Sequence, residues 1–208
     1  MFDAAFQAQL TRLLAWRRDV RRFQRTTLPD GALERLIAIA CLAPSVGLSQ
    51  PWRFVIVEDA ARRAAVRDDY RRCNAEALAA QDAARAGLYA RLKLAGLDEA
   101  PAHLAIFCDR GTPVGHGLGR RTMPEMADYS VVTAAHTLWL AARAQGIGMG
   151  WVSILDPVAI ARVLDAPADW RFIGYFCLGY PLEETDQPAL ATAGWEARRP
   201  RDDVVLRR

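Results

Sequence analysis

Three arginines flank a carboxylate near the start of the chain, in the run Arg17-Arg18-Asp19-Val20-Arg21. A guanidinium group can hold a phosphate through two parallel hydrogen bonds, so this run is a candidate phosphate site. The neighbouring positive charges should keep Asp19 ionised, and an ionised carboxylate can accept a proton. A charged helix end would show the same spacing, and this structural alternative stays open.

Two further segments leave backbone groups free to contact a ligand. Residues 43–52 form a loop with short side chains and a glycine, and Ser45 and Gln50 are its polar candidates. Residues 146–153 carry glycine at three alternate positions, which would let a flat group approach the backbone, with Ser153 at the rim. A plain loop and simple strand packing are the alternatives for these two segments.

The sequence contains neither HExxH, a motif of metalloenzymes, nor GxSxG, a motif of hydrolases, and it also lacks the dinucleotide-binding motif GxGxxG. His136 falls in an apolar helical stretch, where we expect a buried core residue. The four cysteines form no CxxC pair, and Cys41, Cys108 and Cys177 sit inside apolar runs, as core residues do. We therefore expect no metal site and a reducing, cytoplasmic setting.

The candidate residues must be positioned by helices that alternate with strands. Apolar spacing predicts helices at residues 2–14, 30–41, 60–95, 125–145 and 157–164, and strands at 53–57, 104–108, 147–154, 172–178 and 204–206. Asp30 is expected to cap the second helix. Region 60–95 is rich in alanine and arginine and has a weak apolar face, so part of it should be exposed. The alternation indicates an α+β or α/β fold in a single domain over residues 1–208.

Composition narrows the classes of protein further. The chain has 208 residues, a formal net charge of +3 and a single lysine, Lys93, among 27 basic residues. No glycine precedes that lysine, so a P-loop is absent and arginines or backbone amides must bind any phosphate. The charge is too small to indicate a nucleic-acid partner. No apolar run approaches the roughly 18 residues of a membrane span, and we expect no secretory signal.

Together, and in this order, the three polar segments resemble the flavin-dependent nitroreductase family. The run at residues 17–21 resembles its RRSxR opening, with Asp19 in place of serine, and residues 43–52 resemble its APSxxxxQPW loop. Further similarity, to one branch of the family, covers residues 99–101, 122–132, 138–154 and 177–181. The resemblance extends over roughly residues 10–200. The dipeptide Leu48-Ser49 departs from that branch, where bulkier side chains are expected.

The resemblance implies an α+β nitroreductase-like fold with a central, mostly antiparallel sheet flanked by helices. It also implies an intertwined homodimer with FMN at the interface between the subunits. The arginines would hold the FMN phosphate and ribityl chain, and Ser45 and Gln50 would approach from the other subunit. The residues implied to bind FMN are Arg17, Arg18, Arg21, Ser45, Gln50 and Arg198, with Arg199 as the alternative tail arginine.

In the branch that the sequence resembles, reduced FMN is a substrate and molecular oxygen is the co-substrate. The isoalloxazine is fragmented to 5,6-dimethylbenzimidazole, the lower ligand of cobalamin, and erythrose 4-phosphate. Asp19 and Ser153 match the functional carboxylate and hydroxyl of that branch. A carboxylate can move protons, and a serine hydroxyl both donates and accepts a hydrogen bond. The electrons would come from NAD(P)H through a separate, transiently bound flavin reductase.

Two other functions stay open at the level of sequence. An ordinary NAD(P)H-dependent nitroreductase or flavin reductase would retain FMN through catalysis. A non-enzymatic flavin-binding protein would bind FMN without turnover. The oxygen-dependent reaction needs a lid that shields reactive species from water, and region 60–95 is the candidate, with a merely solvated helix as its alternative.

Overall fold

A four-stranded antiparallel sheet forms the centre of the molecule. The computed structural model describes residues 2–92 and 94–208, so Met1 and Lys93 lie outside the described residues. The strand order is β1-β2-β4-β3, and every neighbouring pair is antiparallel. The strands are β1 (Trp52–Ile56), β2 (Ala102–Asp109), β3 (Gly148–Val152) and β4 (Trp170–Gly179). The predicted α+β class with a mostly antiparallel sheet is confirmed.

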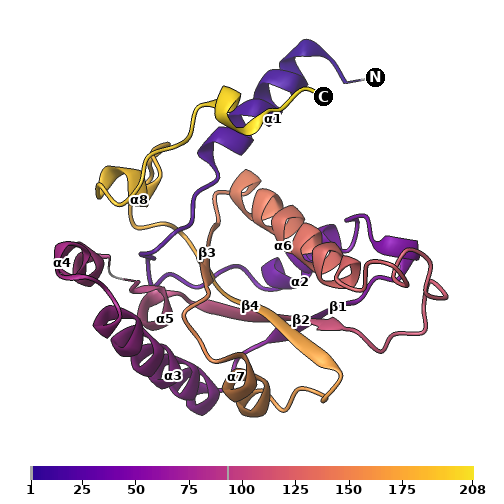
Figure 1. The fold of residues 1–208 in the computed structure, drawn as a ribbon, viewed down its shortest axis with the longest axis horizontal. Coiled ribbons are helices and arrows are strands. Elements are labelled where there is room, and N and C mark those ends of the chain that lie inside the picture. Colours follow the sequence, from indigo (N-terminus) through magenta and orange to yellow (C-terminus); the bar gives the residue numbers. More distant parts are fainter. Residues whose placement is uncertain (1, 93) are drawn as a thin grey trace.

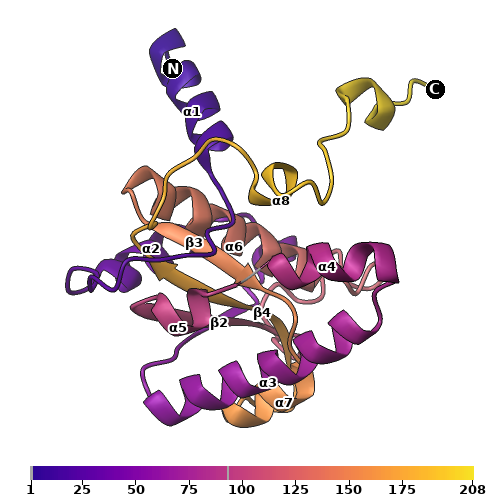
Figure 2. The same ribbon diagram turned by 90° about the vertical axis from the view of Figure 1, so that its left-hand side faces the viewer.

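Helices cover both faces of this sheet (Figure 1). α2 (Ala32–Ala40) and α6 (Met126–Ala144) pack on one face. α3 (Ala60–Ala79), α5 (Gly96–Glu99) and α7 (Pro157–Val163) cover the other. The remaining elements are α1 (Ala4–Trp16), η1 (Val46–Leu48), α4 (Ala83–Arg91), α8 (Ala189–Thr192) and η2 (Arg201–Val204). α1 and the C-terminal segment extend away from the body of the molecule (Figure 2).

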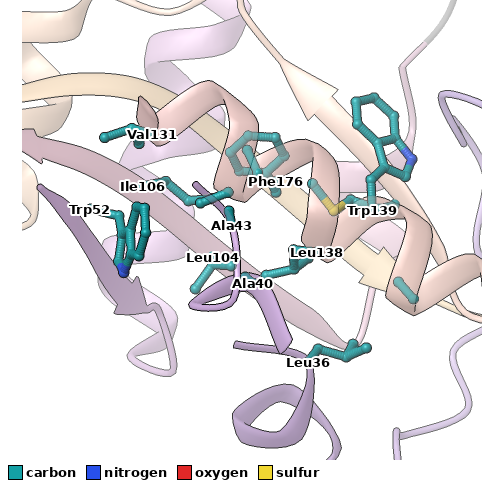
Figure 3. Close-up of a cluster of buried hydrophobic side chains, with 14 of the residues drawn as sticks. Leu36, Ala40, Ala43, Trp52, Leu104, Ile106, Val131, Leu138, Trp139 and Phe176 are labelled. Carbon is teal, nitrogen blue, oxygen red and sulfur yellow. The ribbon is translucent and has the colours of Figure 1, made fainter. Parts of the chain in front are cut away.

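Alternation along β2 builds two separate cores, because successive side chains of a strand point to opposite faces. Leu104 and Ile106 contribute to the core beneath α2 and α6, which also contains Leu138 (Figure 3). Ala105 and Phe107 contribute to the core beneath α3 and α7. All five side chains are fully buried. The two cores fix the sheet between the helical layers. They thereby fix β3, the edge strand beside which the candidate site lies.

The exposed character expected of region 60–95 is confirmed. α3 is a helix of 20 residues with Val66 as its buried residue, and α4 follows after a break at residues 80–82. Asp59 caps α3 by accepting a hydrogen bond from Arg62 N, and Asp82 caps α4 in the same way through Arg85 N. Within the described residues, every helix is too short or too polar to cross a lipid bilayer.

Two expected boundaries are wrong. α2 begins after Gly31, whose φ of 70° turns the chain, and the Asp30 side chain makes no cap among the described contacts. Residues 201–204 form a 3-10 turn, and no strand forms at 204–206 within the described chain. Val204 and Leu206 are exposed there, because no neighbouring strand offers them a partner.

Two residues assigned to the core are also misplaced. Cys41 lies at the C-terminal end of α2 and is exposed. His136 is exposed on the outer face of α6. Both fall in apolar stretches, but helical rotation turns them away from the sheet. Cys108 and Cys177, by contrast, are buried as predicted.

Candidate active site

Residues 17–22 run beside the edge strand β3. Val20 N donates to the Met149 carbonyl oxygen at 3.1 Å, and Asp19 forms a parallel bridge with Met149. This close approach requires glycine: a Cβ at Gly150 would lie 2.2 Å from the Val20 carbonyl oxygen, and one at Gly148 would lie 2.8 Å from Val20 Cγ2. The expectation that alternating glycines admit a flat ligand is corrected, since Gly150 admits the backbone of Val20 and Gly148 admits its side chain.

Trp139 of α6 holds this run from the other side. Its Nε1 donates to the Arg18 carbonyl oxygen at 3.0 Å, and the Arg17 guanidinium lies 4.8 Å from the ring centre. Trp139 lies at the edge of the core cluster, so it links that core to the arginine run (Figure 3). Its role was not predicted, although a tryptophan in a buried helix usually seeks a partner for its N–H.

Asp19 is fixed by the backbone of β3. Its Oδ1 accepts a hydrogen bond from Trp151 N at 2.8 Å, and its Oδ2 lies 3.8 Å from Arg21 Nε. Burial raises the pKa of Asp19, and this effect outweighs the lowering by the Trp151 N–H and by the charges of Arg21 and Arg17. The arginines therefore lower the pKa of Asp19, as expected, but the larger and opposite effect of burial was not predicted. Its side chain is still 40% exposed, which leaves water access to the carboxylate.

Four of the predicted phosphate-binding residues meet in one pocket. Arg17, Arg18, Arg21 and Arg198 line it together with residues 188–190. Arg18 Nε is buried and has no hydrogen-bond partner among the described residues. The pKa of Arg18 is lowered by burial first and then by the nearby charges of Arg17 and Arg198. A bound anion would stabilise this cluster of positive charges and would accept a hydrogen bond from the buried, unpaired donor.

Ser153 stands just beyond the end of β3 and is exposed. It follows two residues after Trp151, the residue whose N–H holds Asp19. Two residues of extended chain span roughly 7 Å, so the hydroxyl and the carboxylate lie at the same end of β3. The predicted pair therefore shares one edge of the sheet.

Ser45 and Gln50 lie elsewhere on the chain. Ser45 Oγ accepts a hydrogen bond from Gln50 N at 3.0 Å, and Val46 N donates to Ser130 Oγ at 3.0 Å. The loop is tightly turned, since Gly47 has a φ of 56° and lies against the segment around Gly115. Neither Ser45 nor Gln50 lines the arginine pocket of its own chain.

A buried polar pair lies in the core beneath α3. His103 Nδ1 and Tyr175 Oη are 3.0 Å apart, and both side chains are inaccessible to solvent or nearly so. Burial lowers the pKa of His103 to about 4 and raises that of Tyr175. His103 is therefore neutral near pH 7 and serves packing. In the described part of the chain, no group of three or more His, Cys, Asp or Glu residues could hold a metal ion.

The model of the nitroreductase family matches residues 14–180. The chain belongs to the nitroreductase family. It is 56% identical to the 5,6-dimethylbenzimidazole synthase of Rhodospirillum rubrum over 200 residues. The aligned region covers 96% of this chain and 95% of that protein. It is 44% identical, over 199 residues, to the 5,6-dimethylbenzimidazole synthase of Rhodobacter capsulatus, with 96% of each chain covered.

Solved structures agree with this family membership. The structure of iodotyrosine deiodinase bound to FMN and 3-iodo-L-tyrosine has a TM-score of 0.73 to this chain at 25% identity. The superposition covers 95% of this chain and 97% of the deiodinase chain. A nitroreductase-like protein from Streptococcus mutans also has a TM-score of 0.73, at 19% identity, with 96% and 98% covered. The predicted nitroreductase-like fold is confirmed.

Proposed function

We propose that this nitroreductase-family protein is a 5,6-dimethylbenzimidazole synthase. It uses molecular oxygen to fragment reduced FMN into 5,6-dimethylbenzimidazole, the lower ligand of cobalamin, and erythrose 4-phosphate. One observation carries the proposal: Asp19, a carboxylate with a raised pKa, is fixed in the wall of the arginine pocket. The near full-length similarity to two such synthases supports it.

The arginine pocket suits the phosphate of FMN. Arg18 Nε is a buried donor without a described partner, and a phosphate oxygen would satisfy it. We assign Arg17, Arg18 and Arg21 to the phosphate and ribityl chain, with Arg198 assisting from the C-terminal segment. Burial lowers the pKa of Arg18 most, and a phosphate would relieve the repulsion from Arg17 and Arg198 that lowers it further.

When bound, reduced FMN supplies the electrons that oxygen accepts and the carbon skeleton that becomes the product. The task of Asp19 is to accept and return a proton. Its Oδ1 is occupied by the Trp151 N–H, whereas Oδ2 lies beyond hydrogen-bonding distance of Arg21 Nε, so Oδ2 is the atom that exchanges the proton. A raised pKa suits this task, because the carboxyl group then protonates closer to the working pH. Ser153 would orient the reacting groups by donating and accepting a hydrogen bond.

A second copy of the chain would complete the site. Ser45 and Gln50 lie outside the arginine pocket of their own chain, so they reach FMN only from a partner subunit. Their loop belongs to a surface that exposes large apolar side chains, with Leu48 71% and Leu118 72% exposed. α1 also exposes a row of apolar side chains, with Phe6 41%, Leu10 42% and Leu14 45% exposed. Surfaces of this kind are typical of protein interfaces, and we propose a homodimer of single FMN-binding domains over residues 1–208.

We place the reaction in the cytoplasm, where a separate NAD(P)H-dependent flavin reductase would supply reduced FMN by transient contact or diffusion. All four cysteines are free, as a reducing compartment favours. Region 60–95 is the proposed lid. Tyr70 of α3 lies within reach of the Arg21 charge: burial first, and then Tyr89 of α4, raise the pKa of Tyr70, and Arg21 lowers it.

A comparison of two assays tests the proposal. Reduced FMN, mixed with the protein and oxygen and no other enzyme, should yield 5,6-dimethylbenzimidazole on chromatography. The contradicting outcome is steady NAD(P)H oxidation with FMN unchanged, which an ordinary nitroreductase or flavin reductase would show. Tight FMN binding without either reaction would identify a flavin-binding protein instead.

A further inference from the structure

Trp195 is the residue through which the C-terminal segment touches α4. Its ring centre lies 6.1 Å from that of Tyr89 at an interplanar angle of 61°, an edge-to-face arrangement. The Arg85 guanidinium lies 5.5 Å from the centre of the same indole. Trp195 is half-buried, whereas the residues on either side of it are exposed. The contact therefore fastens a solvated segment to the candidate lid.

α4 is weakly attached apart from this contact. Among its nine residues, all of them described, none is buried. Tyr89 Oη donates to Asn74 Oδ1 at 3.0 Å and so ties α4 to α3. α3 is anchored more firmly, because Val66 is fully buried and Arg62 Nη1 donates to the Val163 carbonyl oxygen. A helix without a buried residue opens at little cost in free energy, so α4 is the part of the candidate lid best able to move.

On its other side, Trp195 leads to the arginine pocket. Trp195 N donates to the Leu190 carbonyl oxygen at 2.9 Å, and Gly194, with a φ of 75°, makes the turn between them. Residues 188–190 and Arg198 both line the pocket. α4 and α8 lie near each other in both views (Figures 1 and 2). Moving Trp195 would therefore move one wall of the phosphate pocket.

We propose that Trp195 is a positioning residue that latches α4 to the C-terminal segment. With Tyr89 and Arg85 it would hold α4 closed over the site while it holds Arg198 against the phosphate. Binding of the phosphate at Arg198 would in turn stabilise the closed position of α4, because the two sites share one segment. The inference deepens the proposed function, on which it rests for the identity of the ligand.

The test measures two quantities in the full-length protein: the Kd for oxidised FMN, and the rate of tryptic cleavage after Arg91 with and without FMN. We expect FMN to slow this cleavage in the unaltered protein. Trp195→Ala should weaken FMN binding about tenfold, equivalent to about 1.4 kcal/mol, and should abolish the protection even at saturating FMN. Trp195→Phe keeps an edge-to-face partner for Tyr89 and should restore both quantities to within about threefold.

The matched control is Glu196→Ala, since Glu196 is exposed and its carboxylate contacts the backbone of Ala197. This variant should behave like the unaltered protein. The latch is overturned if Trp195→Ala keeps FMN-dependent protection, or if Trp195→Phe is as impaired as Trp195→Ala. Product formation without FMN protection would refute the latch alone. Protection without product formation would refute the proposed reaction and leave the latch intact.

Discussion

Replacing Asp19 by asparagine separates the charge of this side chain from its shape. Asparagine keeps an oxygen that can accept the Trp151 N–H, now made at 2.8 Å, but it cannot exchange a proton. Loss of a general acid or base lowers rates by about 10²–10⁴, so we expect product formation to fall by at least about 100-fold, or about 2.7 kcal/mol in the barrier. FMN affinity should change by less than about threefold, because the phosphate contacts are assigned to the arginines.

Stability should hardly change in this variant. A hydrogen bond to a neutral amide oxygen is weaker than one to a carboxylate by about 1 kcal/mol. Asparagine, however, carries no charge whose hydration is lost on folding, and that loss is the main cause of the raised pKa of Asp19. The two effects oppose each other, so the Tm should shift by no more than about 2–4 °C.

The assay is single-turnover formation of 5,6-dimethylbenzimidazole from reduced FMN and oxygen, measured as a function of pH. The unaltered protein should gain activity as pH rises through the raised pKa of Asp19, and Asp19→Asn should show no such limb. The matched control is Asp68→Asn, a similar charge change at a side chain that is 70% exposed. Full product formation by Asp19→Asn with intact FMN binding would refute the role of this carboxylate.

Three other changes should have distinct results. Ser153→Ala should slow product formation by about tenfold or more without weakening FMN binding, as judged by turnover and equilibrium dialysis. Arg18→Ala should weaken FMN binding by about 30-fold, or about 2 kcal/mol, and riboflavin binding far less, because riboflavin lacks the phosphate. Arg22→Ala should spare both because Arg22 pairs with Glu99. Lowering the pH from about 6.5 to about 4 should reduce the free energy of unfolding by up to about 3 kcal/mol through His103. In this range His103 binds a proton in the unfolded chain but stays largely neutral in the folded chain, where its pKa is about 4. Denaturant titrations across this pH range should show a smaller loss in His103→Gln.

Strands and long helices could be predicted because their signals are local. The apolar runs within β2 and β4 and the periodic helix α6 need no knowledge of distant residues. Val204 and Leu206 show the limit of that reasoning. An apolar triplet has strand propensity, but it becomes a strand only beside a pairing partner, and none lies there in the described structure.

The arginine run at residues 17–21 was predictable from residue types and Arg198 only from the family resemblance, whereas the burial of Asp19 was not predictable. Its hydrogen-bond donor, Trp151 N, is 132 residues away in sequence, and the burial that raises its pKa arises only when the chain folds. The latch at Trp195 was missed for the same reason. A lone tryptophan in an arginine-rich tail gives a signal, but only the fold shows that it meets Tyr89.

The most direct test of the central claim is the stoichiometry of one turnover. The protein is mixed anaerobically with chemically reduced FMN, oxygen is admitted, and FMN, 5,6-dimethylbenzimidazole and erythrose 4-phosphate are quantified. The account predicts about one molecule of each product for each FMN consumed. Quantitative recovery of intact oxidised FMN, with no dimethylbenzimidazole, would contradict it.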